Sequence, residues 1–171
     1  RFGRPLVGVA GSNGKTTVKE MITRILSQAG ATLATRGNFN NHIGVPLTLL
    51  RLEASDRFAV IELGADRPGE VAQLAGYARP DVGIVTNAGA EHLEGFGDLP
   101  GVARAEGEIF AGLAPGGVAV INADDPFSDL WRTMTRARVV SFGVRAAADF
   151  RAEDIQTRID GAGFTTEFTL V

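Results

Sequence analysis

The residues with the clearest chemistry form the stretch GSNGKTT at positions 11–17. Glycines let the backbone approach an anion closely, and backbone N–H groups at the start of a helix bind phosphate. A lysine adds a positive charge, and a threonine hydroxyl can hold Mg²⁺. The form G-x-x-G-K-T-T is shorter than the usual phosphate loop, because Val9 stands where the first glycine would fall. The stretch predicts a phosphate-binding loop made of Gly11, Ser12, Asn13, Gly14, Lys15, Thr16 and Thr17.

Two other interpretations of this loop are possible. A glycine turn can precede a lysine by chance, although here it lies between an apolar run and a helical pattern, as a phosphate loop does. A dinucleotide-binding fingerprint would need a glycine at position 9 and an acidic residue about 20 positions later. Val9 and Arg36 stand near those points instead, so the phosphate loop is favoured.

One acidic residue, Glu62, lies inside the apolar run AVIELG. A carboxylate in a buried strand is costly unless it is paired or bound to a metal. A structural ion pair is one explanation. Because the phosphate loop predicts a divalent cation nearby, we interpret Glu62 as a Mg²⁺ ligand.

A second polar stretch, TNAGAEHLEGFG, follows the apolar run at 82–86. Open α/β sheets place ligands at the carboxyl ends of their strands. His92 is flanked there by Glu91 and Glu94, which suits contact with metal or phosphate. A packed or surface histidine is the alternative, and the residues alone do not decide between the two.

A third polar stretch, GNFNNHIG, holds Asn38, Asn40 and Asn41 in one short loop. Asparagine is common in turns because it tolerates the left-handed region. The loop as a whole also offers many donors and acceptors, so we expect it to recognise a polar ligand.

These residues need elements that bring them together. Apolar runs alternate with helical patterns over residues 5–142, which predicts an α/β fold of the P-loop NTPase type, with a mostly parallel sheet and helices on both faces. The later alternation around Asp160-Gly161 predicts a C-terminal antiparallel β-hairpin. The expected strands are 6–10, 32–35, 58–63, 82–86, 118–122 and 139–142, and the expected helices are 16–28, 46–50, 68–78, 102–113 and 125–136.

Composition excludes several classes of protein. The net charge is −3, and no basic run indicates a nucleic-acid or membrane surface. No apolar stretch reaches the ~18 residues of a membrane span. The chain has no cysteine, which rules out disulfides and thiolate metal sites. It begins at Arg1 without a methionine, and we expect it to be a fragment.

Four stretches together resemble the Mur ligases in order and spacing. They are GSNGKTTVKEMITRIL, TRGNFNNHIGVPLTLL, AVIELGADRPGEV and EHLEGFGDLPGVARAEGEIFAGL. The asparagine loop and HLEGFG look like the family member that joins D-alanyl-D-alanine to UDP-N-acetylmuramoyl-tripeptide. A sister Mur ligase, a ligase of the folylpolyglutamate type and a nucleotide-binding module without catalysis are the alternatives.

The resemblance implies a domain organisation. Residues 1–171 look like most of the central ATP-binding domain, without the N-terminal UDP-sugar domain, the C-terminal domain and the end of the central domain itself. We expect a bacterial, cytoplasmic, monomeric enzyme that works with its own flanking domains and with neither nucleic acid nor membrane insertion.

The resemblance also implies a reaction and its site residues. ATP and Mg²⁺ would convert the substrate carboxylate to an acyl phosphate, which the amine of D-alanyl-D-alanine then attacks. By motif position, Lys15 holds the β/γ-phosphates, Thr16 and Glu62 bind a first Mg²⁺, and His92 binds a second. Asn87 is expected near the nucleotide, and the substrate residues are Asn38, Asn40 and Asn41.

One position departs from the family. Glu106 stands where the family usually has a lysine that CO₂ converts to a carbamate supporting the second Mg²⁺. Glutamate keeps the negative charge on a shorter side chain. Our hypothesis is that Glu106 replaces the carbamate, with a bridging water to the metal; the alternative is a solvent-facing helix residue.

Overall fold

The computed structural model of the chain describes residues 3–161 and 163–171. Eight strands form one sheet in the order β2-β3-β1-β4-β5-β6-β7-β8, and the neighbours from β2 to β7 are parallel. The predicted mostly parallel sheet is therefore confirmed. The strands are β1 (Leu6–Ala10), β2 (Thr32–Ala34), β3 (Phe58–Glu62), β4 (Val82–Val85), β5 (Val118–Asn122), β6 (Arg138–Gly143), β7 (Phe150–Asp160) and β8 (Gly163–Leu170).

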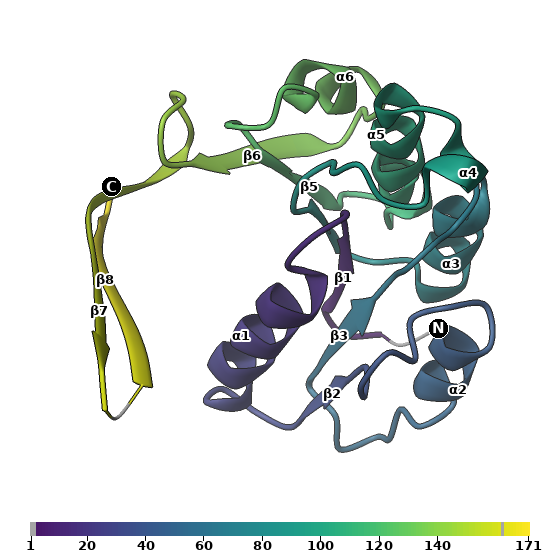
Figure 1. Cartoon of the computed structure of the whole chain (residues 1–171). Coiled ribbons are helices and arrows are strands. Elements are labelled where there is room, and N and C mark those ends of the chain that lie inside the picture. Colours follow the sequence, from purple (N-terminus) through teal and green to yellow (C-terminus); the bar gives the residue numbers. More distant parts are fainter. Residues whose placement is uncertain (1–2, 162) are drawn as a thin grey trace.

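Helices lie on both faces of the sheet, as predicted (Figure 1). Side chains alternate along a strand. In β1, Val7 and Val9 pack toward α1 (Lys15–Ser27), while Leu6 and Ala10 belong to the larger core on the other face. That second layer contains α2 (Gly44–Leu49), α3 (Glu70–Ala78), α4 (Leu93–Phe96), α5 (Leu99–Gly107), the 3₁₀ helix η1 (Glu108–Gly112) and α6 (Ser128–Thr133).

The helix boundaries differ from the predictions at identifiable residues. The helix expected over 102–113 starts earlier, because Asp98 caps it by accepting from the Gly101 N–H at 2.6 Å. It continues beyond Gly107 only as η1. The helix expected over 125–136 is shorter in the structure, and the four-residue helix α4 was not predicted.

The C-terminal hairpin is confirmed and stands apart from the helical layers (Figure 1). β7 and β8 pair antiparallel, while β7 joins the sheet through only a short parallel pairing at Phe142–Gly143. The predicted turn falls after Asp160, and its residue 162 lies outside the described residues. Exposed apolar side chains lie along the hairpin, including Ile159, Phe164, Phe168 and Leu170.

Within the described part of the chain, no helix is long and apolar enough to span a membrane.

Candidate nucleotide-binding site

The phosphate loop joins β1 to α1 at the carboxyl edge of the sheet. Gly11 and Gly14 have φ angles of 118° and 83°, which residues with side chains rarely adopt. A Cβ on Gly11 would lie 2.1 Å from the Thr86 hydroxyl. Gly14 is the N-cap of α1, so the first N–H groups of the helix, at residues 15–17, have no partner within the helix and point to where an anion would bind.

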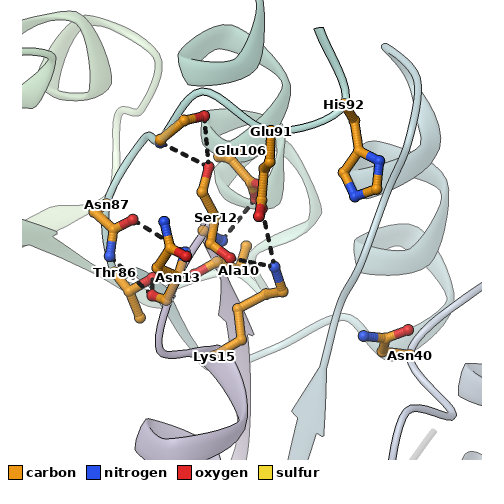
Figure 2. Close-up of polar contacts among 12 residues, drawn as sticks. Ala10, Ser12, Asn13, Lys15, Asn40, Thr86, Asn87, Glu91, His92 and Glu106 are labelled. Carbon is orange, nitrogen blue, oxygen red and sulfur yellow. Dashed lines mark hydrogen bonds and ion pairs between the residues drawn. The ribbon is translucent and has the colours of Figure 1, made fainter. Parts of the chain in front are cut away.

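The loop after β4 holds the phosphate loop in place (Figure 2). The Asn87 side-chain oxygen accepts from the Asn13 N–H at 3.0 Å, and the Asn87 amide donates to the Asn13 carbonyl at 2.8 Å. The Thr86 hydroxyl donates to the same carbonyl, and the Ser12 hydroxyl accepts from the Gly89 N–H, both at 2.8 Å. These side chains therefore fix the shape of the phosphate loop.

Lys15 has its ammonium group at the mouth of the loop. Its Nζ donates to the Ser12 carbonyl at 2.8 Å and lies 3.5 Å from a carboxylate oxygen of Glu91. In the sequence, Glu91 stands out only as a neighbour of His92. Glu91 lies in the loop after β4 and Lys15 is the first residue of α1, so no local pattern could indicate their pairing (Figure 2).

Glu62 is buried and bonded to neutral groups. Its side chain accepts from the Thr16 hydroxyl at 3.0 Å and from the Asn40 side-chain amide at 2.9 Å. Its backbone N–H donates to the hydroxyl of Thr35, a residue that the sequence does not single out. A carboxylate oxygen and a hydroxyl oxygen are ligands of the kind that Mg²⁺ prefers, and here the two lie close together. Thr16 and Glu62 therefore fit the predicted first metal site.

His92 lies beside a cavity of about 330 Å³. It is the N-cap of α4 with φ 51°, its side chain is half exposed, and its Nε2 lies 3.4 Å from an Asp66 carboxylate oxygen. The cavity extends to the asparagine loop and to Lys15. Its lining residues include Lys15, Asn38, Asn40, Asn41, His42, Asp66, Gln73 and His92.

The three asparagines have different surroundings. Asn41 accepts from the N–H groups of Ile43 and Gly44 at 3.1 and 2.9 Å, so its side chain organises the start of α2. Asn40 holds Glu62, and Asn38 lines the cavity. The turn chemistry considered for this loop thus applies to Asn41.

Glu106 lies beneath the phosphate loop on α5. Its side chain is buried, and its carboxylate accepts from the Gly11 N–H at 2.6 Å (Figure 2). The alternative of a solvent-facing residue is therefore wrong. Burial raises the pKa of Glu106 to about 7, and the Gly11 hydrogen bond and the Lys15 charge oppose that rise.

The second metal site is not assembled in the described residues. Among residues 3–161 and 163–171, no group of three or more His, Asp or Glu side chains is placed to hold an ion. His92 contacts Asp66, whereas Glu106 contacts Gly11. A shared metal role for His92 and Glu106 stays a prediction.

Comparisons with known proteins point to one family. The model of the Mur ligase middle domain matches residues 9–169. The UDP-N-acetylmuramoyl-tripeptide–D-alanyl-D-alanine ligase of Escherichia coli is 50% identical over 96% of this chain and 36% of its own length. The chain thus spans about a third of this curated relative.

Solved structures agree. A crystal structure of MurF from Acinetobacter baumannii aligns with 96% of this chain, and the alignment covers 38% of the MurF chain. The TM-score is 0.88 and the sequence identity is 35%. MurF ligase from Thermotoga maritima, in complex with ADP, matches 98% of this chain and 40% of its own, with a TM-score of 0.82 and 32% identity.

Proposed function

Since the chain belongs to the Mur ligase family, as a middle domain, we propose that it is the ATP-binding part of a ligase that joins D-alanyl-D-alanine to UDP-N-acetylmuramoyl-tripeptide. The observation that carries the proposal is the 50% identity to the Escherichia coli ligase of that name. The UDP-sugar and C-terminal domains of the complete enzyme would be its partners within the chain. With the family we also propose a bacterial, cytoplasmic, monomeric enzyme.

The proposed reaction forms an amide in two steps. A carboxylate oxygen of the tripeptide attacks the γ-phosphorus of ATP, which gives an acyl phosphate and releases ADP. The amine of D-alanyl-D-alanine then attacks the acyl carbon, and phosphate leaves. The protein contributes mainly positioning and neutralisation of charge.

Lys15 and the backbone of residues 11–17 would hold the phosphates. Lys15 would exchange its contact with Glu91 for the β- and γ-phosphate oxygens, so the ion pair of the free protein marks where negative charge is accepted. The N–H groups at the start of α1 would donate to the same phosphates. Asn87 would act on the nucleotide through the loop shape that it fixes.

Thr16 and Glu62 would hold the first Mg²⁺, which screens phosphate charge when bound. For a second Mg²⁺, His92 would have to leave Asp66 and Glu106 would have to leave Gly11. The two proposed steps therefore do not depend on that ion. We keep the replacement of the carbamate by Glu106 as a hypothesis, tested by the Mg²⁺ dependence of a complete enzyme carrying Glu106→Gln.

The cavity beside His92 would receive the reacting end of the substrate. It lies next to Lys15, where the γ-phosphate would be, and is lined by polar side chains. We propose that Asn38 and Asn40 face the substrate, and that Asn41 contributes by shaping the loop.

A domain exchange tests this function. Residues 9–169 would replace the matching segment of the Escherichia coli ligase, and amide formation would be assayed with D-alanyl-D-alanine and, separately, with glutamate as the acceptor. We expect ligation with D-alanyl-D-alanine alone, abolished by Lys15→Ala. A folded chimera that binds ATP but ligates only glutamate would overturn the assignment. The isolated 171-residue chain should bind Mg·ATP weakly and form no amide.

A further inference from the structure

We propose that Lys19 is a positioning residue for Glu62 and acts through Thr35. The metal-binding consequence rests on the proposed function, because it requires Glu62 to be a Mg²⁺ ligand. The positioning itself rests on contacts within the protein.

Lys19 is buried in a way that is unusual for a lysine. Its side chain is 0% exposed, and Lys15 is the only other lysine of the chain. Its Nζ donates to the Thr35 carbonyl at 2.9 Å and to a Glu20 carboxylate oxygen at 2.6 Å. Burial of an ammonium group is costly unless such contacts compensate. A well-packed apolar side chain would avoid the cost, so a contribution other than packing is indicated.

Thr35 links Lys19 to Glu62. It is 2% exposed and lies directly after β2, two residues before the asparagine loop. Its carbonyl oxygen accepts from Lys19, and its hydroxyl oxygen accepts from the Glu62 N–H at 3.0 Å. Thr35 therefore binds Lys19 through its backbone carbonyl and holds the backbone of Glu62 through its side-chain hydroxyl.

Two residues of α1 reach Glu62 by separate routes. Thr16 and Lys19 are three positions apart, so they lie on the same side of the helix. Thr16 bonds directly to one carboxylate oxygen of Glu62, whereas Lys19 acts through Thr35. The other carboxylate oxygen accepts from Asn40, in the asparagine loop that follows Thr35. Lys19 thus anchors the chain segment that orients both the backbone and the carboxylate of Glu62.

The first test measures the positioning without any ligand. Amide hydrogen exchange of the 171-residue chain would be followed by NMR for wild type, Lys19→Met and the control Arg24→Met, which removes an exposed cation from the same helix. We expect the Glu62 amide to exchange at least about tenfold faster in Lys19→Met alone, with the β4 amides unchanged. Unchanged Glu62 exchange in a folded Lys19→Met protein would overturn the proposal.

Variants of Thr35 keep the test decisive if Lys19→Met does not fold. Thr35→Val removes the hydroxyl at nearly constant volume, and Thr35→Ser retains it. We expect Thr35→Val to speed exchange at Glu62 and Thr35→Ser to restore protection. Equal exchange in Thr35→Val and Thr35→Ser would contradict the link.

The second test measures the consequence for metal binding. ADP affinity would be determined by calorimetry with and without Mg²⁺. We expect Lys19→Met to bind ADP as tightly as wild type in the absence of Mg²⁺. The increase in ADP affinity on adding Mg²⁺ should be roughly tenfold smaller in Lys19→Met than in wild type. An unchanged gain would overturn the metal-binding consequence. If wild type shows no gain, the proposed role of Glu62 fails, while hydrogen exchange still decides the positioning.

Discussion

Several polar side chains at the carboxyl edge of the sheet have a defined partner, and these partners determine the effect of a substitution. Lys15 and Glu62 show the contrast. The Lys15 ammonium meets a partly exposed carboxylate that a phosphate would displace in the proposed function, whereas the Glu62 carboxylate is buried and held by neutral donors. Removal of Lys15 should therefore affect ligand binding more than folding.

We expect Lys15→Met to weaken ADP binding by about ten- to a hundredfold. A hydrogen bond to a charged group contributes about 1.5–3 kcal/mol, and the partly exposed pairing with Glu91 contributes little to stability. Calorimetric titration with ADP measures the first effect, and urea unfolding measures the second. Arg24→Met serves as the control for loss of a cation. A large loss of stability with unchanged affinity would contradict the assignment.

Glu106 makes stability depend on pH in a defined direction. Because burial raises the pKa of Glu106 from 4.5 to about 7, the folded protein retains a proton that the unfolded chain has lost in this range. Its stabilising effect is greatest below pH 4.5 and is lost as the pH rises through 7. Between pH 5 and 8, wild type should lose roughly 2 kcal/mol relative to Glu106→Gln.

Urea unfolding of both proteins, followed by fluorescence of the buried Trp131, measures this difference. Other ionisable groups cancel in the comparison, since they are common to both proteins. A stability difference that is constant from pH 5 to 8 would show that Glu106 is not protonated by burial.

At the scale of elements, the asparagine loop allows structural and substrate roles to be separated. Asn41 accepts two backbone N–H bonds at the start of α2. We expect Asn41→Ala to destabilise the chain by about 1 kcal/mol, and Asn41→Asp, which retains the acceptor, to restore most of that loss. Thermal unfolding measures both. If neither variant changes stability, the side chain has no structural role and a substrate role gains support.

Local patterns predicted most of the elements. The phosphate loop and the apolar strand runs were found because their signals lie within a few residues. The break at Gly107 was missed because glycine alone does not end a helix; here the side chains of Met134 and Trp131 pack close to it. The short helix α4 has too few residues for a periodic signal.

Longer-range features could not be predicted. The alternation of apolar runs and helical patterns indicates a parallel sheet, but it does not specify the order of the strands within that sheet. Neither the Glu91 contact with Lys15 nor the Thr35 contact with Glu62 has a local signature, because each joins residues that are far apart in the sequence. The metal, nucleotide and substrate roles of the site residues stay predictions.

At the scale of the whole molecule, the hairpin should contribute little to the stability of the sheet. Phe164 and Phe168 are 69% and 55% exposed. We expect their joint replacement by threonine to change unfolding free energy by less than about 1 kcal/mol, and to lower the binding of an apolar dye. Phe110→Ala, in the buried core, should cost about 3–5 kcal/mol. Strong destabilisation by the hairpin substitutions would show that these side chains pack against the body.

The hydrogen bond between Gly11 and Glu106 joins positions 95 residues apart. β1 also pairs with β3 and β4, whose residues lie far along the chain. Loops of this length must close before such contacts can stabilise them, which slows folding. During synthesis, the phosphate loop is made before α5, and it cannot reach its final form until α5 has been added. The nucleotide site is therefore completed only after α5 has packed beneath it, although its phosphate loop precedes most of the elements that support it.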